Sequence, residues 1–114
     1  MTLFNPSQSQ AQPQPQTQFP NAGTVTEFAL TTTITTIAPD RSTSRNRRGF
    51  TIYNDGTANA LFAYGTTISP TAFTAEIFPG GYFEDSSGFP WQGPAVMRST
   101  SSPTNVNVTE LVLI

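Results

Sequence analysis

The side chains of this sequence that could do chemistry are almost all carboxylates and hydroxyls. The 114-residue chain has no histidine and no cysteine, and its five cations are all arginines. A reaction would therefore lack an imidazole, a thiol or a lysine amine as base or nucleophile. Carboxylates could still place a pair across a sugar bond. The seven acids are Glu27, Asp40, Asp55, Glu76, Glu84, Asp85 and Glu110.

Most of these acids are better explained by turns and by solvent-facing strand positions. Asp55 suits a turn, and Glu76 alternates with apolar neighbours. Glu84-Asp85 could bind a hard cation, but no further oxygen-rich loop follows. The glycines lack the lysine and the helix of a phosphate-binding loop. We therefore expect no enzyme, and no catalytic, cofactor-binding or metal-binding residue.

The arginines are clustered. Four of the five lie between Arg41 and Arg48, where the planar guanidinium group would suit the carboxylates of a partner. A solvated loop that offsets nearby acids is the alternative. The net charge of −2 and the absence of lysine argue against a nucleic-acid partner. Arg45, Arg47 and Arg48 are the candidate partner contacts.

An aromatic loop, Gly88-Phe-Pro-Trp-Gln-Gly-Pro94, supplies another candidate. Trp91 lies between two prolines, and a tryptophan so placed is either a lid over one end of the core or an exposed anchor for a partner. Both interpretations remain open from the sequence.

The elements that must position these loops have strand character. Phe50 and Ile52 alternate with polar residues, Asn54-Asp55-Gly56 is a turn signal, and a second run extends from Leu61 to Tyr64. Two such runs separated by Asp-Gly predict a β-hairpin, in which glycine supplies the positive φ of a tight turn.

Residues 24–37 contain seven threonines, and so many β-branched residues predict one long strand. Its Phe28, Leu30, Thr32 and Ile34 share a face. Val25 and Ile37 have the opposite parity, which predicts a bulge at each end or two partly covered faces.

The rest of the chain consists of short alternating runs separated by turns. Strands are expected in residues 72–78, 82–85, 95–98 and 105–114, with a turn at Pro79-Gly80-Gly81. The apolar last strand should be buried in a sheet or at a subunit contact. Six or seven strands without helical periodicity predict an all-β fold, a small antiparallel β-sandwich or barrel, for residues 23–114.

Residues 1–22 form a separate, extended arm. Glutamine occupies every second position from Gln8 to Gln18, and this Gln/Pro-rich composition cannot form its own core. Phe4 and Phe19 are its large apolar groups and its candidate contacts. At about 3.1 Å per residue the arm would reach roughly 70 Å, far beyond its own domain, so we expect it to dock on neighbouring chains. A solvated tail is the alternative.

No apolar stretch is long enough to cross a membrane, and the start of the chain resembles no export signal. We therefore expect no membrane partner.

From the basic cluster onward, the sequence resembles a family of small virion proteins of tailed bacteriophages, including phages of cyanobacteria. The similar segments are Arg47-Arg-Gly-Phe-Thr-Ile-Tyr-Asn-Asp-Gly56, Ala58-Asn-Ala-Leu-Phe62, Ile77-Phe-Pro-Gly-Gly-Tyr-Phe-Glu84 and Val108-Thr-Glu110. The resemblance extends over roughly residues 45–114 and does not include the arm.

This resemblance implies a β-sandwich structural protein without a cofactor. In some members it is a cement (decoration) protein on the outer capsid surface of the virion, made in the host cytoplasm, which braces junctions between major capsid subunits. The implied partners are the major capsid protein and neighbouring copies, commonly in a homotrimer, with the arm lying over adjacent subunits.

Two other functions remain open. The chain could be a neck or tail structural protein, which would share the fold and the arm but differ in copy number. It could also be a receptor-binding or glycan-binding tip that uses the aromatic loop around Trp91.

Overall fold

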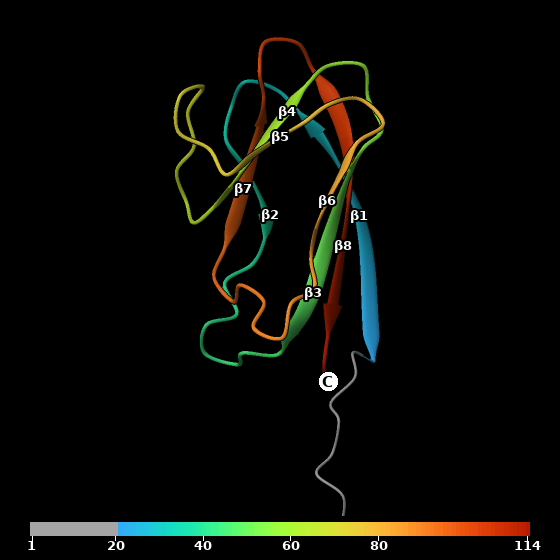
Figure 1. The fold of residues 1–114 in the computed structure, drawn as a ribbon, viewed down its shortest axis with the longest axis vertical. Helices are drawn as coiled ribbons and strands as arrows, with labels where there is room; N and C mark the ends of the chain where they lie inside the picture. The colour runs from blue at the N-terminus through green and yellow to red at the C-terminus, as the bar shows by residue number, and fades with distance from the viewer. Residues whose placement is uncertain (1–20) are drawn as a thin grey trace, which may run out of the picture.

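The computed structural model describes residues 21–114, which form two antiparallel four-stranded sheets packed face to face. The predicted all-β sandwich is confirmed. Figure 1 shows the two layers, with strand order β1-β8-β3-β6 in one sheet and β2-β7-β4-β5 in the other. The predicted contacts Phe4 and Phe19 lie outside the described residues.

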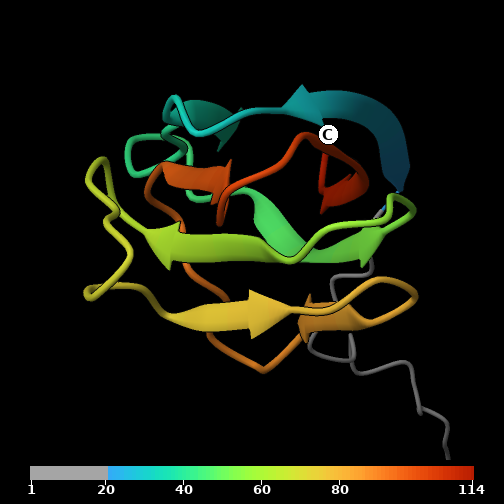
Figure 2. The same cartoon turned by 90° about the horizontal axis from the view of Figure 1, so that it is seen from above.

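The strands are β1 (Ala22–Leu30), β2 (Thr35–Ala38), β3 (Arg47–Asn54), β4 (Ala60–Tyr64), β5 (Ala75–Ile77), β6 (Tyr82–Asp85), β7 (Ala95–Ser99) and β8 (Thr104–Val112). Seen from above in Figure 2, β1 and β2 lie at one edge of the sandwich, and β5 and β6 lie at the other.

The core lies between the sheets and is built from alternate residues of both. Phe50 and Ile52 of β3 face Phe62 of β4 across it, and the rings of Phe50 and Phe62 are 5.7 Å apart. A second, smaller cluster of Leu61, Ala63, Ile68 and Val96 covers the outer face of β4 and β7. Because β4 is covered on both faces, it shows no polar alternation.

The predicted hairpin of residues 50–64 is wrong. β3 pairs with β8 and β6, whereas β4 pairs with β7 and β5, so the turn carries the chain from one sheet to the other. A hairpin would put Phe50, Ile52 and Phe62 on one face of one sheet. In the sandwich they cover each other from opposite sides, which removes more apolar surface from water.

Asn54 shapes this crossover. Its amide donates to the carbonyl oxygens of Ala58 and Ile77, both at 2.8 Å, and its Oδ1 accepts from Gly56 N at 3.0 Å and Thr104 Oγ1 at 2.9 Å. Gly56 does not have the positive φ expected of it. It is needed because a Cβ there would lie 1.9 Å from Thr104 Oγ1.

The predicted long strand of residues 24–37 is also wrong. It is split into β1 and β2, which lie in different sheets, and the chain turns at residues 31–34. Leu30 and Ile37 are both buried, one from each sheet, so the change of parity reflects a change of sheet. The register of β2 against β7 also shifts between Thr36 and Ala38.

The last strand, β8, is central in its sheet, between β1 and β3. Its early residues Val106 and Val108 are buried, while the terminal Ile114 is 82 % exposed in the single chain. The turn predicted at residues 79–81 is present, with Gly80 at a φ of 80°.

Candidate partner-binding end of the sandwich

The arginine cluster and the aromatic loop lie at one end of the sandwich. The loops of residues 39–46 and 86–94 meet there, beside the start of β1 and the C-terminus (Figure 1). Strand register explains this, because Val112 pairs with both Arg47 and Ala22. We call this surface, formed by residues 39–46 and 86–94, the loop end.

Arg47 is the buried centre of the loop end. Its side chain is completely buried, and its Nε donates to Glu110 Oε2 at 2.8 Å. Its Nη1 donates to the carbonyl oxygens of Trp91 and Gly93 at 3.0 and 2.8 Å, and its Nη2 to that of Pro39 at 2.6 Å. The prediction that Arg47 contacts a partner is therefore wrong, because its guanidinium group holds both loops together inside the chain.

Glu110 is shared by two arginines. Arg41 donates from Nη2 to Oε1 at 2.8 Å and from Nε to Oε2, while Arg47 also binds Oε2. Burial alone would raise the pKa of Glu110, but the hydrogen bonds and charges of the two arginines outweigh it and lower the pKa below its usual value. The same ion pair raises the pKa of Arg41.

Gln92 ties the two loops together through the backbone. Its side-chain Oε1 accepts from Arg47 N at 3.0 Å and its Nε2 donates to Arg47 O at 2.7 Å. The amide thus bonds to both backbone groups of Arg47, as a residue of a neighbouring strand would. Its own carbonyl accepts from Arg41 N at 2.7 Å. Neither loop can therefore move without breaking buried hydrogen bonds of the other.

Trp91 is held from two sides. Its indole Nε1 donates to Pro94 O at 2.8 Å, and its backbone N donates to Asp85 Oδ2 at 3.1 Å. Its ring lies 5.2 Å from that of Tyr64, whose hydroxyl donates to the same carboxylate oxygen. Burial, together with Asp85, raises the pKa of Tyr64. The indole thus covers Tyr64, as the lid interpretation predicts, and is still 40 % exposed. Its interpretation as an anchor for a partner stays a prediction.

The accessible part of the loop end is cationic and aromatic. A cavity of ≈ 500 Å³ is lined by Arg45, Arg48, Ser87, Gly88, Phe89, Pro90 and Gln92. A second cavity of ≈ 350 Å³ shares Arg45 and Phe89 and includes Trp91. Arg45 has a φ of 53°, and its carbonyl accepts from Arg48 Nη1 at 3.1 Å.

The structure thus brings three of the predicted contacts, Arg45, Arg48 and Trp91, to one surface. Sequence reasoning missed Phe89, which is 97 % exposed. Its position between Gly88 and Pro90, outside any alternating run, was the available signal. A side chain of this size in water is a candidate anchor.

Among residues 21–114 no three His, Cys, Asp or Glu side chains group so as to hold a metal ion. Within the same residues no helix is long and apolar enough to span a membrane.

Comparison of the chain with protein-family models, curated proteins and solved structures found no match.

Proposed function

We propose that this protein is a structural virion protein, a cement protein on the outer capsid surface that braces junctions between major capsid subunits. The proposal combines the sequence resemblance to small phage virion proteins with the properties of the loop end. In this proposal the loop end docks on the major capsid protein, and the N-terminal arm lies over neighbouring subunits in a homotrimeric arrangement.

The observation that carries the proposal is a rigid, exposed recognition surface beside the point where the arm enters β1. Arg47, Glu110 and Gln92 immobilise both loops from beneath. Arg45, Phe89 and Trp91 can therefore contact a partner without a large loss of loop entropy. Asn21, near the end of the predicted arm of residues 1–22, is bonded to Val112 and Ile114 at the same end, so one partner surface would meet both the loops and the arm.

The electrostatics favour an acidic, partly apolar partner surface. Arg45 is exposed beside Phe89, and arginine combines well with carboxylates and with aromatic groups. Binding to capsid shells should weaken as salt is raised, and the salt dependence should be smaller for Arg45→Gln.

The matched test uses exposed residues at the two ends. Phe89→Ser should reduce shell occupancy strongly, while Phe78→Ser should not. Phe78 is 60 % exposed and lies at the opposite end, in the turn whose Gly80 N donates to Asn54 O. Arg98→Gln, at a half-buried arginine near the far end of β7, is the corresponding control for Arg45→Gln. Equal effects of Phe89→Ser and Phe78→Ser on shell occupancy would contradict docking through the loop end.

The location and copy number of the protein on phage particles test the cement role itself. We expect many copies on the head, at the junctions between capsid subunits. A few copies at the neck or tail would refute cement and favour a connector. Removal of residues 1–20 should leave a folded domain that binds shells weakly, and unchanged occupancy and heat resistance would refute the role of the arm.

A glycan-binding tip is the second candidate, because Trp91 and Phe89 line one open cavity with Arg45. Aromatic faces beside polar groups suit sugars. Quenching of the single tryptophan by a defined set of oligosaccharides would favour this function, and no response would argue against it.

A further inference from the structure

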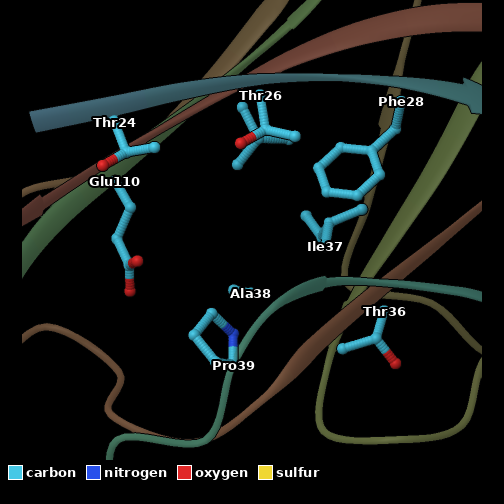
Figure 3. A pocket seen from close by; sticks show the side chains of 9 residues that line it. Thr24, Thr26, Phe28, Thr36, Ile37, Ala38, Pro39 and Glu110 are labelled. Atoms are coloured by element: carbon cyan, nitrogen blue, oxygen red, sulfur yellow. The ribbon is translucent and has the colours of Figure 1, made fainter.

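The edge of the sandwich formed by β1 and β2 contains an open groove. Figure 3 shows Thr24, Thr26 and Phe28 of β1 pointing toward Ile37, Ala38 and Pro39 across it. The cavity measures ≈ 300 Å³. Thr36, Val108 and Glu110 complete its lining.

The groove exists because the two edge strands differ in length. β1 has nine residues and β2 has four, so β2 covers only part of the inner face of β1. Exposed edges of this length are usually interrupted by lysine, proline or a bulge, because they otherwise template another strand. β1 pairs with β8 in an unbroken register, contains no proline and has Glu27 as its only charge.

The direction of the backbone groups of β1 follows from the hydrogen bonds that β8 makes to its two neighbours. On the side of β1, Val112 O accepts a hydrogen bond from Asn21 N. On the side of β3, Asn105 O accepts one from Asp55 N, the residue after that strand. Because alternate residues of a strand direct their N–H and C=O groups to the same side, even-numbered residues of β8 face β1. Their even-numbered partners in β1 face β8 in return.

The outward-directed backbone groups of β1 therefore belong to its odd-numbered residues, Gly23, Val25, Glu27 and Ala29. Within residues 21–114 no strand pairs with this edge of β1. Val25 is 66 % exposed. The side chains of the even-numbered residues, such as Thr26, point into the groove (Figure 3).

The sequence of the arm fits this edge in one orientation. Pro13 and Pro15 remove the N–H groups from one edge of an extended arm, which leaves the edge of Gln12, Gln14 and Gln16 for pairing. In an antiparallel pair, hydrogen-bonded partners project their side chains to the same face. The glutamines would therefore share the outer face with Val25. Ala11, Pro13, Pro15 and Thr17 would then lie over the groove.

We propose that residues 11–17 of a second copy of this chain add to β1 as an antiparallel strand and close the β1–β2 groove. This assignment rests on the arm contacts of the proposed function and names their receptor. Small and proline side chains suit the shallow groove, and backbone pairing supplies most of the contact.

The position of Asn21 favours another copy over the chain's own arm. Its backbone N, its Nδ2 and its Oδ1 all bond to Val112 or Ile114, so residue 21 continues the line of β1 beside the C-terminus. An arm that kept to this line would run away from the groove of its own chain. The chain from Ala11 to Asn21 would span roughly 31 Å at about 3.1 Å per residue, enough to reach a neighbour that lies beside this end of the sandwich. Head-to-tail exchange of this kind forms a ring where the rotation between copies closes, and a trimer is such a ring.

Cross-linking of full-length chains tests the pairing, because the protein has no cysteine of its own. One population carries Gln14→Cys and an isotope-labelled one carries Val25→Cys. The two are unfolded together, refolded and treated with a short bismaleimide. Mass spectrometry should find the link between labelled and unlabelled chains. Glu76→Cys, on the exposed edge strand β5, is the control for Val25→Cys and should give little cross-link between labelled and unlabelled chains.

Two outcomes would overturn the proposal. One is an equal yield of the cross-link between chains when Glu76→Cys replaces Val25→Cys. The other is a link found only within single chains of a Gln14→Cys/Val25→Cys double variant, which would place the arm on its own domain. Shell binding that persists in either case would leave the cement function standing, with the arm on a different protein.

A matched pair of arm variants tests the orientation. Gln14→Pro removes a pairing N–H and should weaken self-association at least about fivefold, with faster hydrogen exchange at Gly23, Val25 and Glu27. Thr17→Pro adds a proline to the edge already interrupted by Pro13 and Pro15, and should leave both quantities nearly unchanged. Equal effects of the two variants, or no effect of Gln14→Pro, would contradict the register.

Discussion

At the scale of single residues, the sequence's most conspicuous feature, its arginine cluster, divides into two roles. Arg47 is buried and satisfied by a carboxylate and three carbonyls, whereas Arg45 is exposed. Two arginines of one sequence motif, two positions apart, thus serve the interior and the surface. The difference comes from their elements, because Arg47 begins β3 under both loops, whereas Arg45 lies in the loop before that strand.

Arg47→Met should lower the free energy of unfolding by about 3–5 kcal/mol, because it leaves buried polar groups without their partner. Arg45→Met, a change of the same size at an exposed position, should cost less than about 0.5 kcal/mol. Urea denaturation measures both. A loss below about 1 kcal/mol for Arg47→Met would mean that the network is dispensable for stability.

Glu110 makes stability depend on pH. The pKa of Glu110 in the folded state is lowered below its usual value of 4.5. Its contribution to the free energy of unfolding is therefore complete above that value and is lost as pH falls through the folded-state pKa. The difference in unfolding free energy between wild type and Glu110→Gln should be constant from about pH 6 to pH 8 and shrink below about pH 4.5. Denaturant titrations at each pH measure it. A constant difference down to pH 2.5 would show that the ionised form has no special role.

At the scale of elements, the crossover between β3 and β4 determines that the fold is a sandwich. Asn54 uses its whole side-chain amide to hold the turn, and Gly56 lets Thr104 approach. The sequence Asn54-Asp55-Gly56 predicted a turn at this position. Thr104 of β8, which holds the turn, lies about fifty residues further along the chain.

Gly56→Ala should destabilise the protein by roughly 2 kcal/mol or more, because the added Cβ would meet Thr104 Oγ1 and the Asn105 backbone at 1.9 and 2.6 Å. Gly88→Ala is the control, since nothing lies within 4 Å of its Cβ position. Thermal unfolding compares them. Similar melting temperatures would mean that the crossover yields easily.

At the scale of the whole molecule, a sandwich of about ninety residues is small, and burial of further surface between copies would stabilise it. If arms are exchanged between copies, unfolding is coupled to dissociation. The melting temperature of the full chain should then rise by roughly 4 °C or more per tenfold increase in concentration. Gln14→Pro should reduce this dependence and Thr17→Pro should not. Calorimetry over a hundredfold range measures it, and a flat dependence for the wild type would contradict exchange.

The sequence by itself determined the class of structure and the places of most strands and turns, though not the turn at residues 31–34. Alternation at Phe50 and Ile52, the turn at Pro79-Gly80-Gly81 and the absence of helical periodicity all depend on neighbours along the chain, and these local signals were sufficient. It also indicated that Arg45 and Trp91 belong to loops with exposed groups, whereas Arg48, expected in the same loop, is a half-buried residue of β3.

Only the tertiary structure decided which strands pair. The split of residues 24–37 between two sheets, the separation of β3 from β4 and the burial of Arg47 against Glu110 all depend on contacts between residues distant in sequence. Burial of a side chain against the opposite sheet leaves no periodic pattern in the residues next to it in the sequence. The open edge of β1 is likewise a property of the assembled sheets, because a free edge exists only once every other strand has found its partner.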